Sequence, residues 1–207
     1  MLYVFRKHSR RALLFCASTI NFPFLTPNRL TLLSIPFSLI AAYYISIAYF
    51  PIAVVFILLS FFIDALDGAL AEIREQKSPF GNYLDAVVDR VTEAIIFFGF
   101  LFLYPVGAAF TFSTGILASY SKARLGAGVE ADNRDWSSLG DRADRAIMLL
   151  AGMSAAIFFP FFFGHSTMEL ALYLIAVAAF VGNIQRLLFA RELIGIYERK
   201  RGSKKND

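Results

Sequence analysis

The 207-residue chain contains one cysteine and two histidines, and only 17% of its residues are charged. The single cysteine, Cys16, excludes a disulfide within the chain and a zinc site built from thiolates. The two histidines, His8 and His165, are too few and too far apart in sequence for a histidine-based metal centre. Any bound metal must therefore rely on carboxylates, which favour hard cations such as Mg²⁺ or Mn²⁺.

Apolar residues are abundant. They make up 57% of the chain, and the mean hydropathy is +0.59, well above the values typical of soluble domains. Six apolar runs each approach the ~20 residues that a helix needs to cross hydrocarbon. The runs lie at residues 31–50, 51–72, 83–104, 106–122, 143–163 and 168–190. The sequence therefore predicts an all-α integral membrane protein with six transmembrane helices.

Residues 3–20 precede the first run and combine a basic flank with an apolar one. We interpret this segment as an amphipathic helix that lies on the membrane surface. A signal peptide is the alternative, but no small-residue cleavage site follows, and a Thr-Pro-Asn-Arg turn leads directly into the first span. The residues of the two flanks are Arg6, Lys7, Arg10 and Arg11, and Phe5, Leu13, Leu14 and Phe15.

The charges of the connecting segments predict the orientation. Residues 48–51 and 104–107 carry no charge, whereas lysines and arginines gather at the N-terminus, around the loops 73–82 and 122–145, and in the tail 196–207. The positive-inside rule places both termini and both loops on the cytoplasmic side of the cytoplasmic membrane. Anionic lipid heads explain the net charge of +4, so no nucleic-acid partner is expected. Without repeats or linkers, residues 1–207 are expected to form one membrane domain, with the helical bundle at 28–195.

Four aspartates lie at helical spacings within residues 64–90, DALDGALAEIREQKSPFGNYLDAVVDR. Asp64 and Asp67 share one helix face at the end of the second span, and Asp85 and Asp89 share another at the start of the third. The short intervening loop makes these helices antiparallel neighbours, so the two faces can converge. Carboxylates this close repel one another at low dielectric unless cations lie between them. The pattern therefore predicts one or two divalent ions.

A simpler explanation is that these aspartates only cap and solvate helix ends. That explanation is sufficient for Glu72, Glu75 and Glu93. It does not account for two spaced pairs accompanied by Gly68 and Gly81, which remove side chains where a ligand could approach the backbone closely.

The aspartate stretch resembles the CDP-alcohol phosphotransferases, whose pattern is D-x-x-D-G-x-x-A-R followed by G-x-x-x-D-x-x-x-D. The resemblance extends to the six-span layout over nearly the whole chain. One position departs, because Glu72 stands where the family has an arginine that contacts the nucleotide diphosphate. That contact would pass to Lys77 or Arg74. The matching positions are Asp64, Asp67, Gly68, Ala71, Gly81, Asp85 and Asp89.

The resemblance implies transfer of a phosphate-linked alcohol from a CDP-alcohol to an acceptor hydroxyl, with release of CMP. It implies two Mg²⁺ or Mn²⁺ ions, one held by Asp64, Asp67 and Asp85, and a second held by Asp64, Asp85 and Asp89. Asp89 would also accept the proton of the attacking hydroxyl. Family members commonly dimerise, so a homodimer is expected. The residues expected at the CDP-alcohol are Gly68, Ala71, Lys77, Ser78 and Gly81.

Basic side chains gather around the second charged loop. Lys122 and Arg124 end the fourth span, and Arg142 and Arg145 begin the fifth. Arg186 lies inside the sixth apolar run, where it needs a carboxylate, carbonyl or anion as partner. These residues could form a solvated surface, with Arg186 reaching the interface. Together they could instead form a phosphate pocket for an acceptor that already carries a phosphate.

Within the family, SYSKAR followed by RADR most resembles the branch that makes phosphatidylinositol phosphate or archaetidylinositol phosphate. Its acceptor is inositol 1-phosphate, and its donor is a CDP-linked lipid drawn from the surrounding membrane lipids. Glycerol 3-phosphate as acceptor and CDP-inositol as a soluble donor remain alternatives. Ester-linked and ether-linked donors are not distinguished, because apolar side chains contact both kinds of tail alike.

An ion-coupled transporter is the rival from another class, since intramembrane carboxylates and arginines also mark ion pathways. Transporters place such groups near the bilayer midplane, often in broken helices. Here the carboxylates lie at the cytoplasmic helix ends, which favours an interfacial enzyme. A purely structural membrane protein would leave the seven matched positions without a cause.

Overall fold

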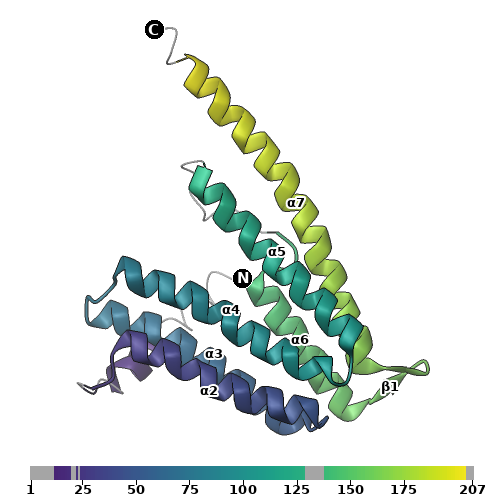
Figure 1. Ribbon diagram of the computed structural model, residues 1–207. Helices are drawn as coiled ribbons and strands as arrows, with labels where there is room; N and C mark the ends of the chain where they lie inside the picture. Colours follow the sequence, from purple (N-terminus) through teal and green to yellow (C-terminus); the bar gives the residue numbers. More distant parts are fainter. Residues whose placement is uncertain (1–11, 20–21, 23, 129–137, 204–207) are drawn as a thin grey trace. The chain divides into compact units, whose positions relative to one another are not determined.

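The computed structural model describes residues 12–19, 22, 24–128 and 138–203, and almost all of them are helical (Figure 1). A short helix over residues 12–19 precedes the six longer ones. The prediction of an all-α protein is confirmed, apart from one small hairpin, β1 to β2. The elements are α2 (Pro27–Ser46), α3 (Phe50–Ile73), α4 (Pro79–Leu101), α5 (Pro105–Gly128), α6 (Arg142–Phe158), β1 (Phe161–Phe162), β2 (His165–Ser166) and α7 (Thr167–Ser203).

Three of the described helices are long and apolar enough to cross a membrane. They are Pro27–Ser46, Phe50–Ile73 and Thr167–Arg199. Large apolar side chains are exposed along these helices, for example Leu39, Leu58 and Leu174, as expected for surfaces that face lipid. The protein is therefore membrane-integral, and the full count of six spans stays a prediction.

The chain divides into two compact units, Met1–Leu103 and Tyr104–Asp207. In the first unit, α2 packs against both α3 and α4. Gly99 of α4 permits this packing, because a Cβ atom there would lie 2.6 Å from the carbonyl oxygen of Ala42 on α2. A small residue at such a crossing lets two helix backbones approach closely. The core of this unit includes Leu30, Ala41, Ile45, Phe50, Ile57, Leu70, Ile96 and Phe100.

In the second unit, α7 packs against α5 and α6. The buried Thr111 hydroxyl of α5 lies 2.9 Å from the carbonyl oxygen of Leu172 on α7 and 2.8 Å from that of Gly107 in its own helix, within hydrogen-bond distance of both. Gly182 of α7 lies directly against the carbonyl of Leu139, where any side chain would collide. The segment that leads into α6 is thereby held on α7. The core of this unit includes Ala108, Leu149, Met153, Met168, Leu172, Ile175 and Ala179.

Most helix ends differ from the predicted spans by a few residues, and the largest differences are at the ends of α5, α6 and α7; α5 ends at Gly128, past the predicted residue 122. The fifth apolar run was expected to be helical over 143–163, but α6 ends at Phe158. Pro160 explains this end, because the residue before a proline is disfavoured in the helical conformation. The last helix continues past residue 190 to Ser203, so the first part of the basic tail is helical.

The described part of the predicted N-terminal amphipathic helix, residues 12–19, is helical. Ala17 is buried there and joins a cluster with Leu30 of α2 and Leu70 of α3. Phe15 on another side of the same helix is 74% exposed. The remaining residues of the predicted segment lie outside the described part of the chain.

Candidate functional site

A pocket of about 100 Å³ lies where α2 and α4 begin and α3 ends. All of its walls belong to the first unit. The lining residues are Pro27, Asn28 and Thr31 of α2, Asp67, Gly68 and Ala71 of α3, and Gln76, Lys77, Ser78, Gly81, Asn82 and Asp85 from α4 and the loop before it. The pocket therefore unites the end of α3 with the start of α4, as the aspartate spacing predicts.

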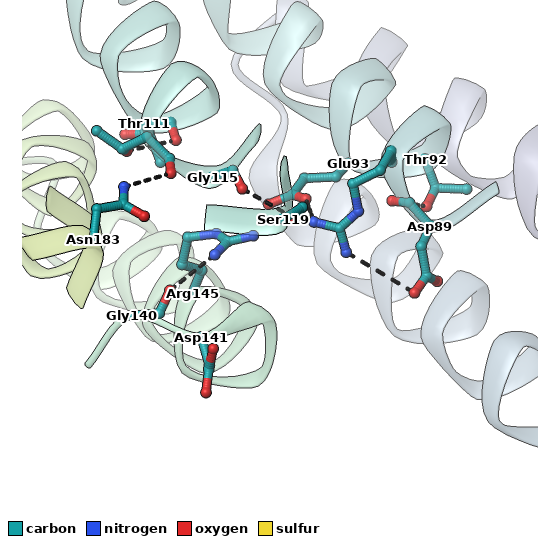
Figure 2. Close-up of polar contacts among 12 residues, drawn as sticks. Asp89, Thr92, Glu93, Thr111, Gly115, Ser119, Gly140, Asp141, Arg145 and Asn183 are labelled. Carbon is teal, nitrogen blue, oxygen red and sulfur yellow. Dashed lines mark hydrogen bonds and ion pairs between the residues drawn. The ribbon is translucent and has the colours of Figure 1, made fainter. Parts of the chain in front are cut away.

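Three of the four aspartates converge. Asp64, Asp67 and Asp85 each offer a carboxylate oxygen, and these oxygens lie within 4.8 Å of one another. Asp67 is buried, and the other two are half-buried. Asp89 lies one turn further along α4 and is outside this group; its Oδ2 is 3.9 Å from Nη2 of Arg90 (Figure 2). The convergence of three carboxylates fits a cation site, and the second ion with Asp89 as a ligand stays a prediction.

The donor set suits a hard divalent cation, because it consists of carboxylate oxygens whose mutual repulsion a cation would offset. The hydroxyl of Thr31 donates a hydrogen bond to Oδ2 of Asp67, and both side chains are buried. The same hydroxyl lies 3.2 Å from the carbonyl of Pro27. It has only one proton, and the charged carboxylate is the stronger acceptor. Thr31 thus fixes the orientation of the carboxylate that lies deepest in the site.

Two helix N-termini line the pocket and favour negative charge there. At α2, the Thr26 hydroxyl accepts a hydrogen bond from the Arg29 N–H, and a proline occupies the first turn. At α4, the Ser78 hydroxyl accepts from the Gly81 N–H over 3.0 Å, and Pro79 follows it. The caps occupy the Arg29 and Gly81 N–H groups, and the helix dipole attracts phosphate at such ends. The pocket therefore combines attraction for a phosphate with carboxylates for the cation that accompanies it.

The two cations considered as substitutes for the missing arginine have different surroundings. Arg74 donates hydrogen bonds to the carbonyl oxygens of Phe22 and Leu25, each over 2.7 Å, and so ties the segment before α2 to the end of α3. Lys77 lines the pocket, with its Nζ 3.3 Å from Oε2 of Glu72. Lys77 is therefore the better placed of the two to meet a ligand.

The glycine of the aspartate motif leaves open space. A Cβ atom on Gly68 would have no neighbour within 4 Å, although this residue lines the pocket. Sequence reasoning did not select four polar side chains that also line the pocket. Two of them, Asn28 and Thr31, lie three residues apart at the start of a largely apolar helix, and this spacing was the available signal. The four are Asn28, Thr31, Gln76 and Asn82.

The predicted basic residues belong to the second unit. Arg186 is buried, forms an ion pair with Asp141, and has Nη1 3.3 Å from Oδ1 of Asn183. The prediction that it needs a partner is confirmed. Arg145 is also buried and donates to the Gly140 carbonyl over 2.8 Å (Figure 2), so the alternative of a solvated surface residue is wrong for it.

The remaining three predicted cations lie at the ends of α5 and α6. Lys122 and Arg142 are half-buried, and Arg124 is exposed. Their joint action as a phosphate pocket stays a prediction.

A helical membrane protein with clustered carboxylates beside a phosphate-attracting pocket has the features of a metal-dependent phosphotransferase. Residues 24–182 match the CDP-alcohol phosphatidyltransferase family. The match covers most of the chain and extends through both units. The chain belongs to this family and is an enzyme of the CDP-alcohol phosphotransferase class, and its aspartate cluster could hold a divalent cation.

Two relatives indicate the branch of the family. An archaetidylinositol phosphate synthase of Pyrococcus horikoshii is 30% identical over 174 residues, which cover 81% of this chain and 85% of the relative. The crystal structure of Mycobacterium tuberculosis phosphatidylinositol phosphate synthase with CDP-DAG bound has a TM-score of 0.74 at 26% identity, covering 87% of this chain and 94% of that one. The same enzyme in complex with manganese and citrate has a TM-score of 0.75 at 25% identity, covering 86% and 88%.

Proposed function

We propose that this protein transfers the phospholipid group of a CDP-linked lipid to a hydroxyl of inositol 1-phosphate and releases CMP. The observation that carries the proposal is the convergence of Asp64, Asp67 and Asp85, two of which, Asp67 and Asp85, line a pocket at the start of two helices. The names of the relatives support inositol phosphate as the acceptor. The structure of the mycobacterial enzyme with CDP-DAG supports a lipid donor.

In the proposed reaction, the acceptor hydroxyl attacks the phosphorus that carries the lipid. The bond from this phosphorus to the bridging oxygen breaks, and that oxygen leaves with CMP. Divalent ions would neutralise the diphosphate and the charge that develops on the leaving group. Asp64, Asp67 and Asp85 would hold one ion, and Asp64, Asp85 and Asp89 a second. Asp89 would also accept the proton that the acceptor hydroxyl loses.

The proposed donor site uses the pocket as the structure describes it. Gly68 and Ala71 leave room on α3 for the cytidine, and Gly81 does so on α4. Ser78 caps α4 with its hydroxyl and so fixes the start of that helix, where the helix dipole would favour a phosphate. Lys77 would leave Glu72 to contact the diphosphate, because an ion pair this exposed holds it only weakly.

The proposed acceptor site uses the cations of the second unit. Lys122, Arg142 and Arg186 would bind the phosphate of the acceptor, with Arg124 and Arg145 adding positive charge. Arg186 is supported for this role because its guanidinium is buried and Asp141 already holds it in one orientation. A preoriented guanidinium loses little side-chain entropy when it binds a phosphate oxygen.

The proposed membrane arrangement has six spans, formed by α2 to α7. Helices α4 and α5 are each longer than 20 residues, the length that crosses hydrocarbon. Their charged ends and the basic tail support a cytoplasmic active site and cytoplasmic termini, in the cytoplasmic membrane. The N-terminal segment would lie on the same surface. A homodimer is proposed from the family alone.

The first experiment is CMP release by the purified protein with Mg²⁺ or Mn²⁺. CDP-diacylglycerol and CDP-archaeol serve as donors, and inositol 1-phosphate and glycerol 3-phosphate as acceptors. We expect release with inositol 1-phosphate. Release with glycerol 3-phosphate alone would move the protein to the neighbouring branch and leave the metal chemistry intact. Absence of release with every pair, although metal binds, would contradict a lipid donor with a phosphorylated acceptor.

Two aspartate variants separate binding from chemistry. Asp85→Asn should abolish binding of the first ion, as measured by Mn²⁺ titration, and retained affinity would remove Asp85 from the ligand set. Asp89→Asn should lose turnover and keep CMP binding. Near-normal turnover would exclude Asp89 as the base.

A further inference from the structure

The end of α6 and the segment that joins it to α7 expose five phenylalanines within residues 158–163. The joining segment forms the β1 to β2 hairpin, which Figure 1 shows at the junction of the two helices. The exposed fractions range from 56% for Phe162 to 87% for Phe163. The five are Phe158, Phe159, Phe161, Phe162 and Phe163. This much exposed aromatic surface on so short a segment needs an apolar partner.

The tip of the hairpin has an unusual residue in its turn. Phe162 pairs with His165, so the turn has two central residues, Phe163 and Gly164, with φ angles of 48° and 81°. Two positive φ angles define a type I′ turn, where asparagine, aspartate and glycine are preferred. A bulky side chain in this conformation is a strained outlier, and such outliers cluster at functional positions. The turn therefore presents Phe163 outward in spite of its backbone preference.

The backbone of the segment is paired within itself. The two strands pair from Phe161 to Ser166, and the Thr167 N–H donates to the Pro160 carbonyl over 3.0 Å. The Phe159 N–H donates to Ala155 over 2.8 Å. Backbone that enters an apolar layer must satisfy its own hydrogen bonds, since water is absent there. These bonds pair the inward-facing backbone groups of the hairpin, which lowers the cost of placing it at the boundary of such a layer.

The length of α6 leaves a gap that the hairpin can fill. About 13 of its 17 residues follow the charged first turn, which gives about 20 Å of apolar helix at 1.5 Å per residue. The hydrocarbon layer is about 30 Å thick. The apolar span of α7 begins directly after the hairpin, at Thr167. Phenylalanines placed between the two helices would supply the missing apolar depth.

We propose that the hairpin is an aromatic anchor inserted into the boundary between headgroups and acyl chains, at the end of the second unit that carries no lysine or arginine. The lipid bilayer is its partner, and Phe163 at the tip is its principal contact. Ser166 supports this placement, because its hydroxyl donates to the Tyr104 hydroxyl over 2.9 Å. Tyr104, immediately before α5, is the kind of amphipathic aromatic found at membrane interfaces.

The test uses tryptophan as a depth probe. The chain has one tryptophan, Trp136, so the background is Trp136→Phe. Phe163→Trp and, separately, Phe161→Trp are introduced into it, and the full chain is reconstituted into phosphatidylcholine vesicles brominated near the glycerol, at mid-chain or at the methyl end. We expect quenching to be strongest with bromine near the glycerol, about 5–10 Å below the headgroups. Aqueous iodide should not quench either probe.

Three results would overturn the proposal. Quenching by iodide and not by brominated lipid would place the hairpin in water. Quenching by neither would show that protein, such as a second copy of the chain, covers it. The third result comes from Phe163→Asn, which removes the ring and introduces a residue suited to the turn. Combined with the Phe161→Trp probe, this variant should place the probe at a shallower depth. An unchanged depth would show that α6 and α7 place the hairpin without Phe163.

Discussion

Thr31→Val provides the most specific test of the metal site. Valine keeps the shape of threonine and removes the hydroxyl that donates to Asp67. Thr31 is 3% exposed and Asp67 is 6% exposed, so water cannot easily replace the lost donor. A hydrogen bond to a charged group contributes about 1.5–3 kcal/mol. Loss of a group that orients a metal ligand typically weakens metal affinity by about 10–100-fold, and the two ranges agree.

The assay is Mn²⁺ titration of the purified protein by calorimetry, which does not depend on turnover. We expect Thr31→Val to bind Mn²⁺ about 10–100-fold more weakly and to need correspondingly more metal for CMP release. Thr31→Ser should restore most of the affinity, since it restores the hydroxyl. Thr111→Val is the matched control, because the same change removes a buried hydroxyl that lies within hydrogen-bond distance of the Leu172 carbonyl in the second unit. Unchanged Mn²⁺ affinity in Thr31→Val would refute the orienting role.

Three further predictions concern the pocket and its supports. Gly68→Ala should raise the KM for the CDP-linked donor and stabilise α3 by up to about 1 kcal/mol. Gly195→Ala is the control at another open helical position and should leave this KM unchanged. Equal effects of the two variants on the KM would contradict a donor site at Gly68. Arg74→Met should lower the free energy of unfolding by about 1.5–3 kcal/mol per lost hydrogen bond and leave the KM for the donor unchanged. A higher KM in this variant would show that Arg74 contacts the donor. Asp141→Ala should destabilise the protein by about 3–5 kcal/mol, because it leaves the buried Arg186 without its carboxylate; unfolding in detergent at the wild-type temperature would disprove this.

The aspartate cluster could be predicted because helical periodicity is a local property. Spacings of three and four residues place Asp64 beside Asp67, and Asp85 beside Asp89, whatever the rest of the fold does. The loop joins α3 to α4, but the two helices make little direct contact, and it is α2, packed against both, that holds their ends at one site. Asp89 shows the limit of this reasoning. It shares a face with Asp85, yet it lies outside the compact group, because sharing a face of α4 does not fix the distance to the aspartates of α3.

The hairpin could not be predicted from the sequence because of its composition. A run of phenylalanines suits a buried helix and a strand equally well, so periodicity cannot separate them. Pro160 was the available signal for the end of α6. No sequence rule would have placed Phe163 in a type I′ turn, because that turn normally selects asparagine or glycine.

The need of Arg186 for a partner could be predicted from the sequence, whereas the contact of Thr31 could not, because burial is costly for a charged group and not for a hydroxyl that can bond within its own helix. The cost of a buried guanidinium implies a partner from the sequence alone, although the identity of that partner, Asp141, depends on a contact across 45 residues. A buried threonine implies nothing comparable, because its hydroxyl can bond a carbonyl of its own helix, and Pro27 offers one 3.2 Å from Thr31. Its contact with Asp67 spans 36 residues and follows only from the packing of α2 on α3. The carboxylates can therefore be recognised in sequence, while the side chain that orients the deepest of them can be recognised only in the fold.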